Sequence, residues 1–235
     1  MFIHILTHSE LFLLKIITIL LAIFPASVTV HLSMLFKNAT FKASKYLITL
    51  IFIFSLSISV SKFYFLKFYN INYIICFLSI MLGSLIYFLS YLLNIILFKF
   101  FIIHKDTKPK PVQYIFRGIY SSSYSVNFIL YIFIALFEEL LFRAFLFSII
   151  IELKSFYYHN FLIMGTLMLF ALNHINFGWH NVVSKFLMAV VAIFFIIYFN
   201  SLIGAILVHI TFNIIAIYKI NKIVIKNKRL DYGII

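Results

Sequence analysis

The chain has 235 residues, of which 65% are hydrophobic and only 11% are charged. A soluble domain carries about 25% charged residues, so this composition excludes an ordinary soluble globular protein. The formal net charge of +13 does not indicate nucleic-acid binding, because the lysines lie mainly in short segments between apolar runs, where they set topology and contact lipid headgroups.

The apolar runs are long and unbroken, which predicts an all-α, polytopic transmembrane helical bundle of about seven spans in the lipid bilayer. The first span is expected at 10–34, with a kink at Pro25. The second, at 46–60, is short for a hydrocarbon core of ~30 Å. The third lies within 72–103, and the proline- and lysine-containing segment 104–111 marks a solvated break after it.

Four further spans are expected in the second half of the chain. Asn200 and Ser201 form a tight connection between the last two of them. A basic tail follows the last span. The four spans are 126–151, 160–174, 183–199 and 202–220.

The distribution of basic residues predicts the orientation. With seven spans and a cytoplasmic C-terminus, the inner segments carry most of the lysines and arginines, including Lys185. The outer segments carry only Lys62, Lys67 and Lys154. The positive-inside rule therefore predicts an integral membrane protein whose C-terminus is cytoplasmic.

Two of the six acidic residues, Glu138 and Glu139, stand side by side in an apolar run, and Arg143 follows them. Each ionised group at the centre of a membrane helix costs about 2.5 to 3.5 kcal/mol, and such residues indicate a functional site by default. Glu139 and Arg143 have i,i+4 spacing and are expected to pair. Glu138 is rotated by about 100° and remains free for chemistry. A structural ion-pair network or an ion pathway is the alternative.

Two later spans carry further polar residues. His174 follows Phe170 at the end of the fifth span, and His209 and Asn213 share one face of the seventh. If these faces turn inward, the two imidazoles and the amide meet the glutamates in one cavity. Such a set offers a base, its partner and oxyanion donors for hydrolysis. Interhelical hydrogen bonding, worth about 0.6 kcal/mol per pair, is the simpler alternative for His209 and Asn213.

The three patterns EExxxR, FxxxH and HxxxN, in this order and in separate predicted spans, resemble the CPBP (Abi) family of CAAX prenyl proteases and bacteriocin-processing enzymes. They occupy 138–143, 170–174 and 209–213. The resemblance covers about 126–220 and implies an all-helical intramembrane endopeptidase. Its substrate would be a CAAX-type, bacteriocin-leader or other membrane-associated peptide or protein. A bacterial cell membrane is the expected location.

The resemblance also implies residue roles. Glu138 would be the general base that activates a water, helped by His174, while His209 and Asn213 would stabilise the oxyanion. Glu139 and Arg143 would support the site. No cofactor is expected. Because the family has also been described as metal-dependent, a zinc ion held by Glu138, His174 and His209 is the alternative.

The chain is interpreted as one domain in three parts. N-terminal helices and a basic loop occupy 1–125, the catalytic helices 126–220, and a basic cytoplasmic tail 221–235. Two other functions remain open. An ion-coupled transporter would use the carboxylates along a pore, although no internal repeat is visible. An inactive immunity protein would bind a peptide without cleaving it.

Overall fold

The structure is a computed structural model that describes residues 8–35, 43–60, 70–103, 124–152, 156–175 and 179–231. Each regular element in these ranges is a helix, so the expected all-α transmembrane class is confirmed. The helices are α1 (His8–Ile23), α2 (Pro25–Leu35), α3 (Ala43–Val60), α4 (Tyr73–Ile103), α5 (Tyr124–Glu139), η4 (Leu140–Leu146), α6 (Phe147–Glu152), α7 (Phe156–Leu172), α8 (Trp179–Phe199) and α9 (Leu202–Asp231).

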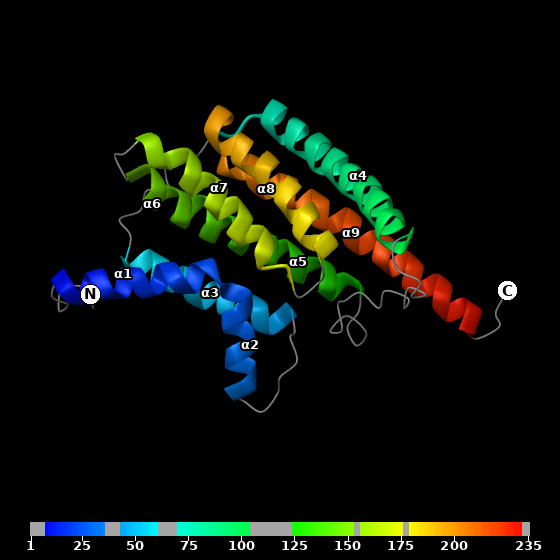
Figure 1. The fold of residues 1–235 in the computed structure, drawn as a ribbon, viewed down its shortest axis with the longest axis horizontal. Coiled ribbons are helices and arrows are strands. Elements are labelled where there is room, and N and C mark those ends of the chain that lie inside the picture. The colour runs from blue at the N-terminus through cyan, green and yellow to red at the C-terminus, as the bar shows by residue number, and fades with distance from the viewer. Residues whose placement is uncertain are drawn as a thin grey trace.

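The Glu pair lies in the middle of the helix bundle. Helices α4, α8 and α9 pack side by side, with α5 against α9 and α7 against α8 (Figure 1). Helix α3 packs against both α5 and α1, so the N-terminal helices cover the other side of α5. The segment η4, which follows the glutamates, contacts α1, α3 and α7 as well.

Several helices have the length and composition of membrane spans. Large apolar side chains on them are exposed, among them Phe77, Phe88 and Tyr198, as expected of surfaces that face lipid. Among the described residues, the candidate spans are Ala43–Val60, Tyr73–Leu93, Asn181–Phe199 and Leu202–Lys219, with the bent pair Ser9–Ile23 and Pro25–Met34 as a fifth. These correspond to five of the expected spans, and the count of seven stays a prediction.

The predicted kink at Pro25 is a break, at which α1 and α2 are bent by 91°. Proline cannot donate a backbone hydrogen bond and clashes with the preceding turn. The carbonyl oxygen of Ile23 accepts a hydrogen bond from Asn173 Nδ2 at 2.6 Å, and the N–H of Ala26 donates to Asn173 Oδ1 at 3.4 Å. Because Asn173 directly follows α7, these two hydrogen bonds connect the break between α1 and α2 to the helix in which the second motif begins.

The expected tight connection at Asn200 and Ser201 is present. Asn200 has a φ of 51°, a left-handed conformation that asparagine adopts more readily than most residues. Ser201 Oγ accepts from the N–H of Gly204 at 3.1 Å, as an N-cap does, and donates to the carbonyl oxygen of Asn70 at 2.7 Å. This turn fixes α8 and α9 as neighbours and holds the segment before α4 beside them.

Helix α4 approaches α9 closely at Gly83. A Cβ at this position would lie 2.8 Å from the carbonyl oxygen of Val208, so the contact requires a glycine. Because Val208 precedes His209, this contact supports the helix turn that carries the third motif. Helix α9 continues to Asp231, beyond the expected end of the span at 220, and α7 ends at Leu172 rather than at 174.

Candidate active site

The first motif lies where the helix changes its winding. Glu138 and Glu139 end α5, and η4 is a π-helix with i→i+5 hydrogen bonds. The chain remains helical through the junction, since Glu139 has φ −66° and ψ −39°. Glu138, Glu139 and Arg143 are 1%, 0% and 2% exposed. π-helical segments inside α-helices occur frequently at functional sites, and this one begins directly after the two glutamates and contains Arg143.

The expected pair of Glu139 and Arg143 is present. Arg143 donates to Glu139 Oε1 at 3.1 Å, and its guanidinium lies 4.1 Å from the centre of the Phe170 ring. The same carboxylate oxygen lies 2.8 Å from His209 Nδ1. Since a carboxylate only accepts, His209 carries its hydrogen on Nδ1. Glu139 therefore neutralises Arg143 and orients the histidine of the third motif.

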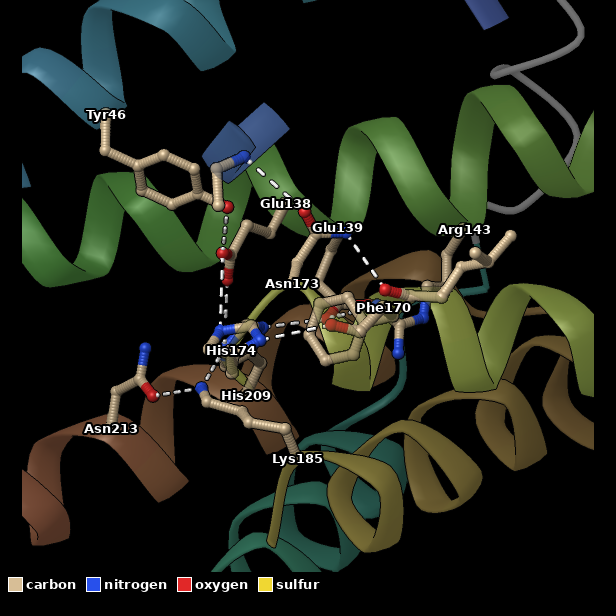
Figure 2. A network of polar contacts seen from close by, with 12 residues as sticks. Tyr46, Glu138, Glu139, Arg143, Phe170, Asn173, His174, Lys185, His209 and Asn213 are labelled. Carbon is tan, nitrogen blue, oxygen red and sulfur yellow. Dashed lines mark hydrogen bonds and ion pairs between the residues drawn. The ribbon is translucent and has the colours of Figure 1, made fainter. Parts of the chain in front are cut away.

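Glu138 faces three other side chains (Figure 2). The Tyr46 hydroxyl donates to Glu138 Oε1 at 2.6 Å, and His174 Nε2 lies 3.6 Å from the same oxygen. Glu138 Oε2 lies 3.4 Å from His209 Nε2. Helix α3, helix α9 and the turn after α7 thus bring Tyr46, His209 and His174 to the end of α5. The expected convergence of Glu138, His174 and His209 is found.

Two residues of the site were not among the predicted site residues. Tyr46 lies in α3, outside all three motifs. Lys185 was counted with the cytoplasmic loops, but it is buried in α8, so that assignment was wrong. Its Nζ donates to His209 Nε2 at 2.9 Å and to Asn213 Oδ1 at 2.9 Å. One signal in the sequence points to Lys185. Arg143 balances only one of the two glutamate charges, so Glu138 is left without a cation.

A cavity of about 110 Å³ opens onto these groups. Its polar lining includes Glu138, His174, Lys185 and Asn213, whereas His209 is fully buried and does not line it. The first half of the chain contributes three residues to the cavity lining, which are Ala26, Ala43 and Tyr46.

The zinc alternative does not fit this arrangement. Such a site would use His209 Nε2 as a ligand, but the Lys185 ammonium already lies 2.9 Å from that atom and would repel a second cation. In the part of the chain that the structure describes, no group of three His, Cys, Asp or Glu side chains is arranged to hold a metal ion.

The described geometry thus brings a carboxylate, an imidazole, an amide, an ammonium and a phenol to one cavity, with Glu139 and His209 buried behind them. Residues 120–215 match the family model described as type II CAAX prenyl endopeptidase Rce1-like. A search of curated proteins and a search of solved structures gave no significant match. The matched segment contains the three motifs in the order that the resemblance requires. Residues 120–215 of this integral membrane protein are therefore similar to the Rce1-like CAAX prenyl endopeptidases, which confirms the resemblance predicted from the three motifs.

Proposed function

We propose that the protein is an intramembrane endopeptidase that hydrolyses a peptide bond with a water molecule activated by Glu138 and His174. The observation that carries the proposal is the separation of 3.6 Å between Glu138 Oε1 and His174 Nε2 at the cavity wall. This distance is too long for a direct hydrogen bond, but one water can contact both atoms.

The hydrogen bonds around His174 support a role as acceptor. His174 Nδ1 lies 3.1 Å from the carbonyl oxygen of Phe170, which cannot donate, so the hydrogen belongs on Nδ1. The lone pair on Nε2 then faces Glu138. Both the carboxylate and the imidazole can accept a hydrogen bond from the same water, which orients its oxygen toward a substrate in the cavity.

The reaction proceeds through a tetrahedral intermediate. The water oxygen bonds to the carbonyl carbon, its proton passes to Glu138, and the π electrons of the carbonyl move onto the oxygen. When this oxyanion collapses, the C–N bond breaks and the proton held by Glu138 passes to the leaving nitrogen. The products are a carboxylate and an amine. Glu139 and Arg143 form the ion pair that supports the site. His209 and Asn213 lie on the side of the site where the oxyanion forms.

The family match supports a CAAX-type peptide as the substrate, presented from the membrane. A bacteriocin leader or another membrane-associated peptide is the alternative. The orientation remains the one expected from the lysines, with the C-terminus in the cytoplasm of a bacterial cell. Even when Lys185 is not counted, the inner segments carry more lysines and arginines than the outer segments.

Glu138→Gln tests the proposal. The amide cannot take a proton from water, so kcat/KM should fall by about 10³-fold or more while the fold is kept. The assay uses purified protein in liposomes and a quenched fluorescent peptide that ends in a prenylated cysteine and three further residues. Glu10→Gln, at an exposed position in α1, is the matched control and should cleave normally. A chelator should leave the wild-type rate unchanged.

The outcomes separate the alternatives. Cleavage by Glu138→Gln at the wild-type rate contradicts the proposed base. If the wild type binds the peptide tightly but never cleaves it, the protein is a peptide-binding immunity protein. If it cleaves nothing and moves cations in a manner that Glu138→Gln abolishes, the carboxylates serve transport.

A further inference from the structure

Lys185 is a buried cation inside the active site that the three motifs do not include. Its side chain comes from α8 and is 8% exposed. It donates to His209 Nε2 and Asn213 Oδ1, both at 2.9 Å, and its Nζ lies 5.2 Å from the centre of the Phe212 ring. Three residues of α9 thus hold the end of one lysine, as Figure 2 shows for His209 and Asn213.

The hydrogen-bond pattern leaves His209 without a free N–H. Its Nδ1–H donates to Glu139 Oε1 at 2.8 Å. Its Nε2 faces an ammonium group, which can only donate, so Nε2 accepts. An alkyl amine is a far stronger base than imidazole, so the proton shared by this pair resides on the lysine. His209 therefore cannot donate to a developing oxyanion in this arrangement.

The charge balance of the site also favours a protonated lysine. Glu138, Glu139 and Arg143 together carry one net negative charge when all are ionised, and all three are buried. The Lys185 ammonium cancels that charge, and buried charges persist in proteins when they are compensated in this way. Lys185 and Glu138 contact the same atom, His209 Nε2, at 2.9 Å and 3.4 Å.

The cavity wall decides which group meets a substrate. Lys185 and Asn213 line the cavity, while His209 is 0% exposed behind them. Lys185 has three N–H groups, and two are used by His209 and Asn213 among the described residues. The third remains available for an oxygen in the cavity.

We infer that Lys185 is a catalytic residue, which donates its third N–H to the oxyanion of the tetrahedral intermediate. His209 and Asn213 are then positioning residues that aim the ammonium. This inference rests on the proposed peptidase function. As the carbonyl π electrons move onto oxygen, the ammonium stabilises the new negative charge without transferring its proton. When the oxyanion collapses, the ammonium returns to its starting contacts.

Lys185→Met tests the inference, because it keeps the length of the side chain and removes its charge and N–H groups. On the quenched prenyl-cysteine peptide, kcat should fall by about 10²–10³-fold with KM nearly unchanged, as for loss of one oxyanion donor. Lys219→Met is the matched control, since Lys219 is a partly buried lysine of α9 that lies 4.1 Å from the Tyr91 ring, outside the site. It should keep the wild-type rate.

A second measurement distinguishes an oxyanion contact from a structural role. Two uncleavable versions of the same peptide are compared, one with an anionic phosphinate and one with a neutral hydroxyethylene group at the scissile bond. Lys185→Met should weaken phosphinate inhibition by about the factor lost in kcat, and hydroxyethylene inhibition by less than about threefold. If Lys185→Met does not fold, Lys185→Gln, which keeps polarity without charge, is used with the same expectations.

The inference is overturned if the variant keeps kcat within about threefold of the wild type, or if both inhibitors weaken equally. Glu138→Gln run in parallel distinguishes the two proposals. An inactive Glu138→Gln beside an active Lys185→Met removes only the role of Lys185. An active Glu138→Gln, or a wild type that does not cleave, removes the peptidase mechanism and with it this inference.

Discussion

The Tyr46 hydroxyl connects the first half of the chain to the proposed base. It donates to Glu138 Oε1 at 2.6 Å from a buried position in α3. A hydrogen bond to a charged group contributes about 1.5–3 kcal/mol. The contact holds one carboxylate oxygen and so fixes the direction in which Glu138 faces His174.

Tyr46→Phe should therefore lower kcat by about tenfold or more, because the carboxylate loses this orienting donor. The substitution keeps the ring and its packing, so the fold should be kept, although the midpoint of thermal unfolding should fall by several degrees because the hydrogen bond is lost. Rates on the quenched peptide are compared with those of Tyr198→Phe, whose side chain is 73% exposed on α8. An unchanged rate in Tyr46→Phe would show that the phenol does not position the base.

The motif residues could be predicted because helical spacing relates residues on one helix. The i,i+4 spacing of Glu139 and Arg143 predicts their pair, which is found at 3.1 Å. Tyr46 could not be found in this way, since it is one of 15 tyrosines and belongs to no pattern. Lys185 lies near the expected start of a span, where a lysine ordinarily reaches back to the membrane surface.

At the scale of helices, the apolar runs locate the elements because backbone polar groups in lipid must bond within their own helix. Helices α3 and α8 and the start of α9 lie within a few residues of the expected positions, whereas α9 continues past 220 to Asp231. The π-helix at Leu140–Leu146 has no compositional signature, since its residues are as apolar as those of the α-helices on either side. The break after α1 could be foreseen from Pro25, but its hydrogen-bond partner Asn173, directly after α7, could not.

Asn173 joins that break to the active site. Asn173→Leu leaves the carbonyl of Ile23 and the N–H of Ala26 without this partner, at about 1–3 kcal/mol for each buried group. We expect a midpoint of thermal unfolding lower by several degrees, and a lower kcat because His174 is the next residue. Thr166→Val, which removes only a bond within α7 at 2.8 Å, is the control. Equal effects of the two substitutions would contradict the bridging role.

At the scale of the molecule, the site is larger than the region that carries the family motifs. The family match covers 120–215, yet Ala26, Ala43 and Tyr46 form part of the cavity wall. Helices α1 and α3 also contact η4 directly. The first half of the chain is therefore part of the proposed enzyme and not only an anchor for it.

A divided chain tests this conclusion. Residues 1–110 and 111–235, separated within the proline-containing linker, are expressed alone and together in one membrane. We expect peptide cleavage only when both parts are present, because Tyr46 and the motif residues are then reunited. Activity of 111–235 by itself would mean that the N-terminal helices are dispensable for catalysis.

Helix α9 sets the depth in the membrane at which the proposed reaction would occur. At about 1.5 Å per residue, His209 and Asn213 lie about 11 and 17 Å along the axis from Leu202. In a hydrocarbon core of ~30 Å, a span that begins at Leu202 carries them to the bilayer midplane. Water is scarce at this depth. The water molecule that each turnover consumes is therefore not supplied by the surrounding lipid. The cavity of about 110 Å³ has room for several water molecules, and we expect it to serve as their local reservoir.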